Sequence, residues 1–114
     1  MPQLWVRGIP LQKLKACHKP LFSELAEICE CETDNFSIEF WEGITLQFDD
    51  HAPSFPFVEV KWFDRGREVR DRFAQSVSRY LFDVGVHNVE IAFICYEKDA
   101  YYADGVSFAE DLEQ

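Results

Sequence analysis

The feature that most constrains this chain is an internal repeat. Pro2-Gln3-Leu4-Trp5-Val6 matches Pro56-Phe57-Val58-Glu59-Val60 in its proline and its alternation of apolar residues, at an offset of 54 residues. Asn35-Phe36-Ser37-Ile38 likewise matches Asn88-Val89-Glu90-Ile91, at an offset of 53. A period of this length is that of one supersecondary unit, so the chain is predicted to contain two copies of such a unit.

Each copy has the pattern of a strand, a helix and a second strand. The alternating segments predict strands and the three- and four-residue apolar spacing predicts amphipathic helices. Pro20 interrupts the first helix, so we expect a kink near residues 18–20 or two helical pieces. The predicted order is strand 3–7, helix 11–30, strand 36–41, extended run 44–48, loop 49–55, strand 57–63, helix 68–84 and strand 89–95.

Two strand–helix–strand units predict an α/β (α+β) fold with a duplicated β-α-β arrangement. Within each unit the two strands are parallel, because a helix of this length provides the crossover that parallel pairing requires. Placed side by side, the units form a four-stranded mixed sheet with both helices on one face. We therefore predict a single domain over residues 1–114, with repeat units at about 2–48 and 56–95 and a tail at 96–114.

The second face of this sheet has no helix to cover it. Trp5, Trp62 and Phe63 cannot all lie under the helices, because neighbouring strand positions point to opposite faces. An apolar sheet face that is left open marks an interface. We therefore predict an oligomer whose sheets pack against each other.

Composition limits the partners and the compartment. The formal net charge of −10 argues against nucleic acid or an anionic membrane as a partner, since both favour positive surfaces. No apolar run approaches the length of a membrane helix and the first residues lack the signal-peptide pattern, so we expect a cytoplasmic protein. We read the four cysteines as reduced, mostly buried thiols. No metal-ligand spacing or cofactor motif is found, so neither a metal nor a cofactor is expected.

A resemblance to a known family rests on three stretches of the chain. These are Pro2-Gln3-Leu4-Trp5-Val6-Arg7, the second unit from Pro56 through Ile94, and the aromatic and glycine tail Tyr102–Phe108. The proline after the initiator methionine, joined to the repeated β-α-β unit, resembles the tautomerase superfamily, which includes macrophage migration inhibitory factor and 4-oxalocrotonate tautomerase. The motif Pro-Gln-Leu-x-Val-Arg-Gly at the N-terminus and the motif Trp-Phe-Asp-Arg-Gly at Trp62–Gly66 resemble sequences of a small bacterial branch of that superfamily with no assigned function.

The resemblance implies a homotrimer whose sheets line a central barrel, with active sites between neighbouring subunits. It implies that Pro2, once processed to the N-terminus, is the catalytic base for keto–enol proton transfer on a small carbonyl or carboxylate compound. The inhibitory factor has a lysine where this chain has Glu30–Asp34. The cations that would hold a carboxylate are therefore expected to be Arg7 and Arg65.

The resemblance also places the wall of the pocket after the strand 57–63. Phe63 and Asp64 are therefore predicted to bind substrate together with the two arginines, and Tyr102 is predicted to close the pocket from the tail. Each of these residues also has a structural interpretation. Pro2 suits a strand edge and Asp64 suits a turn before a helix, whereas Arg7 suits an ion pair and Tyr102 suits packing against another subunit.

Two other functions are compatible with the sequence. The first is a non-catalytic trimeric binding or scaffold protein of the same fold, in which Met1 is retained and Pro2 is an amide with no basic nitrogen. The second is a ferredoxin-like regulatory domain, which has the same order of elements along the chain. In that arrangement an intervening strand separates the two strands of each half, so the strand order distinguishes the two folds.

Overall fold

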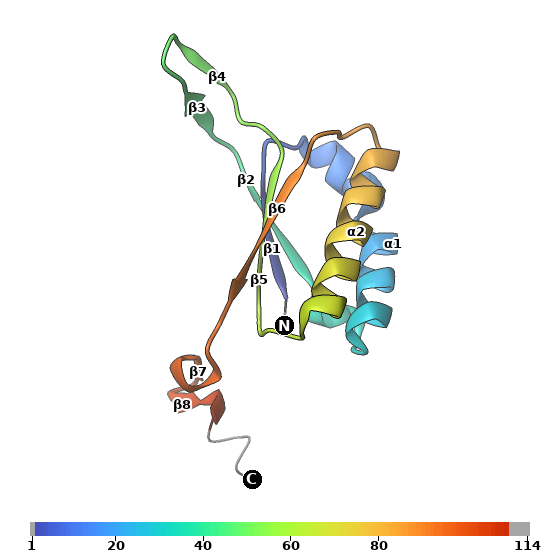
Figure 1. The fold of residues 1–114 in the computed structure, drawn as a ribbon, viewed down its shortest axis with the longest axis vertical. Helices are drawn as coiled ribbons and strands as arrows, with labels where there is room; N and C mark the ends of the chain where they lie inside the picture. Colours follow the sequence, from blue (N-terminus) through green and yellow to red (C-terminus); the bar gives the residue numbers. More distant parts are fainter. Residues whose placement is uncertain (1, 110–114) are drawn as a thin grey trace.

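The computed structural model describes residues 2–109, in which a four-stranded sheet has two helices on one face (Figure 1). The strand order is β2 (Ser37–Trp41), β1 (Gln3–Arg7), β5 (Phe57–Trp62) and β6 (Glu90–Cys95). The two pairs β1–β2 and β5–β6 are parallel, and β1 runs antiparallel to β5 at the centre. The strands of each half pair directly, so the predicted mixed sheet is confirmed and the ferredoxin-like order is excluded.

The core lies between the sheet and the helices α1 (Leu11–Cys29) and α2 (Arg67–Asp83). Alternation along β1 and β5 places every second side chain under the helices. Trp62 is the largest of these and is 0% exposed, packed between Phe73 of α2 and Phe93 of β6. Other buried residues of this layer are Leu4, Val6, Leu14, Leu21, Leu25, Val58, Val60, Val77 and Leu81.

Helix α1 continues through Pro20 and is not divided into two pieces. The ring of Pro20 lies on the exposed side of the helix, so it disturbs none of the buried contacts. The proline removes only one backbone hydrogen bond, and the apolar stripe on both sides of it packs on one sheet. Tertiary packing therefore keeps the helix continuous.

The segment between the two units is a hairpin of β3 (Ile44–Leu46) and β4 (His51–Pro53). The extended run at 44–48 was predicted, but β4 lies inside the stretch 49–55 that was predicted to be a loop. A strand of three residues that is surrounded by turn-forming residues has almost no recognisable sequence pattern. Its pairing with β3 is what defines β4 as a strand. The hairpin projects from the sheet as an arm (Figure 1).

The tail leaves the opposite end of the molecule. It comprises the short 3-10 helix Lys98–Ala100 and the strands β7 (Tyr102–Ala103) and β8 (Val106–Ser107). Together with the hairpin arm it gives the molecule an elongated outline of 53 × 30 × 24 Å (Figure 1). The last part of the predicted tail, residues 110–114, lies outside the described residues.

The four cysteines are free thiols, but they are less buried than expected. Cys17 is buried, Cys29 and Cys31 are half-buried, and Cys95 is exposed near the end of an edge strand. The prediction of mostly buried thiols is therefore wrong for Cys95, which is the last residue of the edge strand β6 and lies beyond the part of that strand that packs on the core. Within residues 2–109, no helix has the length and apolar character needed to cross a membrane.

Candidate active site

Pro2 lies at the end of the sheet from which the tail projects. It directly precedes β1, where Gln3 is aligned with Ser37 of β2 and with Lys61 of β5. This register places Pro2 level with Phe36 and Trp62, which are both buried, and Pro2 itself is buried. The proline predicted to be the base therefore lies at an aromatic-lined edge of the core.

Arg65 lies at the same end, in the connection from β5 to α2. Its Nη1 donates a hydrogen bond to the Phe63 carbonyl oxygen at 3.2 Å, and its guanidinium carbon is 5.7 Å from the centroid of the Trp62 ring. Arg65 is half-buried, and no carboxylate within residues 2–109 pairs with it. In a chain with net charge −10, a partly buried cation without a carboxylate partner has the chemistry of an anion site.

Trp62 adds a second unused donor at this end. Its indole Nε1 is the only buried side-chain nitrogen or oxygen among the described residues that has no hydrogen-bond partner. Leaving such a group unpaired costs about 1–3 kcal/mol. The Pro2 end of the sheet therefore contains a guanidinium without a carboxylate partner and an indole N–H without a hydrogen-bond partner, among the residues that the structure describes.

Cys29 and Cys31 border the same region from the end of α1. The helix ends at Glu30 in a left-handed conformation with φ of 54°, and the Cys31 N–H donates to the Ala26 carbonyl at 3.0 Å. Burial raises the pKa of the Cys29 thiol, while the positive charge of Arg65 acts in the opposite direction. The net rise keeps Cys29 protonated at neutral pH. Our sequence reasoning missed these two residues, because nothing local indicates that the end of α1 reaches Arg65.

Asp64 has a structural role in the turn before α2. Its Oδ1 accepts a hydrogen bond from the Gly66 backbone N–H at 2.9 Å, and its side chain is exposed. This contact shapes the connection that carries Arg65. Asp64 therefore lies in the predicted region, with its carboxylate engaged by the backbone.

Phe63 anchors the tail. Its ring lies 5.0 Å from Tyr101, 5.6 Å from Phe108 and 6.0 Å from Tyr96, measured between centroids. We call Phe63, Tyr96, Tyr101 and Phe108 the tail cluster. Burial and the neighbouring Tyr101 raise the pKa of Tyr96, so its hydroxyl stays neutral. Tyr102 is exposed on β7 and takes no part in this cluster.

Arg7 lies at the other end of β1 from Pro2. Five residues of extended strand separate them, a span of roughly 16 Å at about 3.3 Å per residue. The guanidinium of Arg7 lies over the rings of Phe57 and Phe55, at 4.9 and 5.4 Å from their centroids. Within one subunit the structure therefore brings together Pro2, Phe63, Asp64 and Arg65, but not Arg7.

The open face of the sheet is aromatic and carries charges. Trp5 stacks on Trp41 with centroids 5.1 Å apart, and the Lys61 Nζ lies 3.3 Å from the Trp5 ring centroid. Glu39 and Glu59 flank Trp5 on the neighbouring strands. No helix covers this face (Figure 1). Within residues 2–109, no cluster of three or more His, Cys, Asp or Glu residues is arranged to hold a metal ion.

This sheet order, with a buried proline before the first strand, defines a protein of the tautomerase fold. A fused 4-OT described as an asymmetric trimer is similar in structure, with a TM-score of 0.68 at 11% identity over 99% of this chain and 98% of that one. A macrophage migration inhibitory factor homologue from Prochlorococcus marinus has a TM-score of 0.65 at 14% identity, covering 94% and 97% of the two chains. At these identities the likeness establishes the fold alone.

The chain itself belongs to the family described as a domain of unknown function, DUF1904, whose model matches residues 1–107. A DUF1904 domain from Sebaldella termitidis is 33% identical, with a TM-score of 0.84 over 94% of this chain and 99% of that one. The expected tautomerase fold and the expected family of no assigned function are thereby confirmed. No curated protein matches the chain at a significant level.

Proposed function

We propose that this protein catalyses keto–enol proton transfer on a small carbonyl acid, with Pro2 as the base and Arg65 as the carboxylate-binding residue. The observation that carries the proposal is the half-buried guanidinium of Arg65 at the Pro2 end of the sheet, which pairs with no carboxylate within residues 2–109. A planar guanidinium binds a carboxylate through two parallel hydrogen bonds. Such binding fixes the substrate beside Pro2.

The chemistry requires Met1 to be removed. With Met1 attached, the nitrogen of Pro2 belongs to a peptide bond and has no basic lone pair. After removal it is a secondary amine, and an α-amino group has an ordinary pKa of about 7.7–8.0. A nearby cation such as Arg65 favours the neutral amine. The neutral nitrogen then accepts a proton from the carbon beside a carbonyl and returns it to oxygen or to another carbon.

The proposed active unit is a homotrimer. Support comes from the uncovered aromatic sheet face, from the two projecting arms and from the likeness to a fused 4-OT described as a trimer. In such an assembly Arg7 and Tyr102 of one subunit would contribute to the site of another. Their predicted roles in substrate binding depend on this arrangement.

The test begins with the intact mass of the purified protein, which shows whether the chain starts at Pro2. Turnover of an enol such as phenylpyruvate is then measured for wild type, Pro2→Ala and Arg65→Ala. Pro2→Ala is expected to lower kcat by roughly a hundredfold or more. Arg65→Ala is expected to raise KM for carboxylate substrates, with partial recovery in Arg65→Lys.

The control for Arg65 is Arg67→Ala, because Arg67 is exposed and its one ion-pair partner among the described residues is Asp71, at 3.7 Å. This variant is expected to retain wild-type kinetics. Absence of turnover by a sample that starts at Pro2, over a broad panel of enols, would refute the proposal.

A non-catalytic binding protein of the same fold is the second candidate. The engaged Asp64 carboxylate and the use of Phe63 to anchor the tail favour it, since two predicted substrate contacts already have structural partners. It predicts retained Met1 in the native protein. It also predicts that Pro2→Ala changes stability alone, which the same kinetic and mass measurements distinguish from catalysis.

A further inference from the structure

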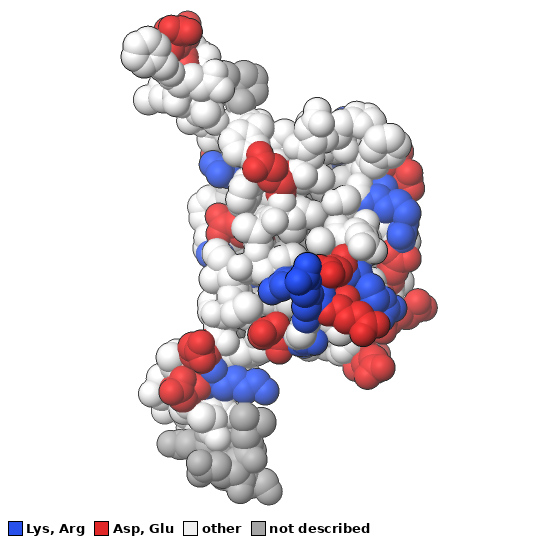
Figure 2. All heavy atoms as spheres, in the orientation of Figure 1, with Lys and Arg blue, Asp and Glu red and all other residues white. Residues whose placement is uncertain are grey.

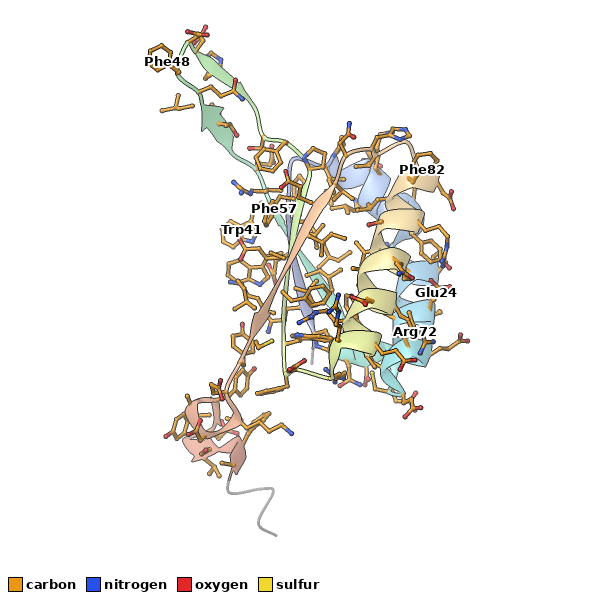
Figure 3. The ribbon with its side chains drawn as sticks, in the orientation of Figure 1. Glu24, Trp41, Phe48, Phe57, Arg72 and Phe82 are labelled. Atoms are coloured by element: carbon orange, nitrogen blue, oxygen red, sulfur yellow. The ribbon has the colours of Figure 1, made fainter. Side chains whose placement is uncertain are left out.

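The hairpin arm exposes apolar side chains that a chain would be expected to bury. Ile44, Leu46 and Phe48 are 75%, 83% and 104% exposed, so the ring of Phe48 contacts almost nothing in its own subunit. Figure 3 shows Phe48 at the far tip of the arm, directed away from the sheet and the helices. Because exposed apolar groups of this size are unfavourable in water, the arm is a contact surface.

The tip of the arm combines this ring with negative charge. Asp49 and Asp50 follow Phe48 and are exposed, and Figure 2 shows acidic atoms at the end of the arm. The turn is held by the Gln47 N–H, which donates to the Asp50 carbonyl at 2.8 Å, and by the His51 N–H, which donates to the Asp50 Oδ1 at 2.8 Å. The same Asp50 Oδ1 lies 3.2 Å from the His51 Nδ1. The arm therefore presents an aromatic ring followed by two acids in an ordered turn, and of the two acids Asp49 has no such partner among the described residues.

A groove of the complementary kind lies between α1 and the edge strand β2. Its volume is about 250 Å³, slightly below the roughly 300–1,000 Å³ of small-molecule pockets, which suits an inserted side chain. Its apolar wall includes Leu11, Phe22, Ile38 and Phe40, and its two basic groups are Lys15 and His18. Within residues 2–109, neither Lys15 nor His18 pairs with a carboxylate.

We propose that Phe48 of one copy inserts into the groove between α1 and β2 of a neighbouring copy, with Asp49 and Asp50 facing Lys15 and His18. The ring of Phe48 is complementary in character to the apolar wall of the groove. The carboxylates of Asp49 and Asp50 are complementary to the basic groups at its rim. The hairpin arm projects away from the sheet and the helices of its own subunit (Figure 1). The Phe48 side chain that fills the groove therefore comes from a second copy of the chain. The outer edge of β2 is unpaired at this position. This inference rests on the proposed self-association, but not on catalysis.

The first test is a disulfide cross-link between the two surfaces. Phe48→Cys and Leu11→Cys are combined with Cys95→Ser, which removes the exposed native thiol, and the protein is incubated with oxidised glutathione. Denaturing gels are expected to show covalent dimers and larger species that disappear on reduction. In the matched control, Phe82→Cys on the outer side of α2 replaces Leu11→Cys and is expected to give no such species. A band that stays monomeric would overturn the proposal.

The second test is a charge exchange read by sedimentation. Asp49→Lys with Asp50→Lys is expected to raise the dissociation constant of the assembly at least tenfold. Adding Lys15→Glu is expected to recover most of the loss, whereas adding Arg67→Glu on α2 is expected to recover none. A wild-type assembly that is unaffected by these exchanges would overturn the docking alone. A monomeric wild type would overturn both the docking and the proposed trimer, and leaves the enol-turnover measurement as a separate question.

Discussion

At the scale of single residues, Gly8 decides how the hairpin returns to the sheet. Its φ is +73°, and a Cβ built there would lie 2.1 Å from the carbonyl oxygen of Phe55. The chain that follows the hairpin therefore passes directly against the backbone between β1 and α1. Gly105 has a similar φ of +79° but has open space around it. Both glycines therefore have a left-handed backbone conformation, but only Gly8 also lies in close contact with another part of the chain.

Replacement of these glycines by alanine is expected to have unequal effects. Gly105→Ala costs about 1 kcal/mol from the left-handed backbone conformation alone. Gly8→Ala is expected to cost at least about 3 kcal/mol, because the backbone at Phe55 must also move. Urea unfolding of the two variants measures the difference. Equal destabilisation would show that the close approach at Gly8 carries no energetic weight.

A second residue-scale prediction concerns Glu24, which joins the two helices. Its carboxylate accepts hydrogen bonds from Ser76 and Arg79 of α2. The hydrogen bond from Ser76 is the largest effect on the pKa of Glu24 and lowers it. Burial acts in the opposite direction, and the hydrogen bond and charge of Arg79 lower the pKa further, so that it lies below its usual range. A lowered folded-state pKa contributes stability above the unfolded value of about 4.3, and this stability is lost as pH falls through the folded value.

Glu24→Gln is therefore expected to lower the stability at pH 7 by about 1 kcal/mol, since the pair is partly exposed to solvent. It is also expected to flatten the loss of stability of the wild type between pH 5 and pH 3, roughly. Thermal melts across this range measure both effects. Glu27→Gln is the control, because Glu27 is exposed on the same helix. Parallel pH profiles for wild type and Glu24→Gln would contradict this assignment.

At the scale of elements, the tail is held to the sheet by its aromatic cluster. The Tyr96 N–H continues the β5–β6 pairing by donating to the Trp62 carbonyl at 2.8 Å, and beyond it the rings of the tail cluster pack on Phe63. Each aromatic pair contributes about 0.5–1.5 kcal/mol beyond its buried area. Phe63 is therefore the attachment point for residues 96–108.

Phe63→Ala is expected to release the tail while the sheet stays folded. Amide hydrogen exchange should accelerate across residues 98–108, with little change in β1 and β5. Phe82→Ala is the matched control, because Phe82 is exposed and, among the described residues, its ring pairs with no aromatic ring of the tail, only with that of His87 at 4.5 Å. Unchanged protection of the tail in Phe63→Ala would show that backbone pairing alone holds it.

At the scale of the whole molecule, the uncovered sheet face, the hairpin arm and the tail are the surfaces that a single subunit leaves without packing partners. Trp41 is half exposed on this face, where it stacks on Trp5 (Figure 3). Phe82 is similarly exposed but lies on the outer side of α2 (Figure 3). The proposed trimer would bury the first residue and leave the second in water.

Trp41→Asp is accordingly expected to dissociate the assembly, because it buries a charge at the proposed interface. Its far-ultraviolet circular dichroism should stay native, since the side chain is outside the core. Sedimentation velocity measures the size, and Phe82→Asp is expected to keep the wild-type size. Retention of the assembly by Trp41→Asp would place the interface elsewhere.

Much of the fold was predictable, because its signals are local. The repeat, the alternation of β1 and β5 and the helical stripes determine the four long strands and both helices. The strand β4 and the continuity of α1 through Pro20 were not predictable, since each depends on packing with distant residues. The same distinction applies to the site. Arg65 follows β5 in the sequence, whereas its proximity to Cys29 arises only when α1 packs beside α2.

The sequence by itself determined that the chain is a duplicated strand–helix–strand unit with a proline before its first strand, because periodicity is a property of neighbouring residues. Only the tertiary structure decided which side chains share an end of the sheet. The antiparallel register of β1 and β5 brings Pro2 level with Trp62, whose ring lies 5.7 Å from the Arg65 guanidinium carbon, and places Arg7 at the opposite end. Register depends on which strands pair, and pairing joins residues that are far apart in the chain.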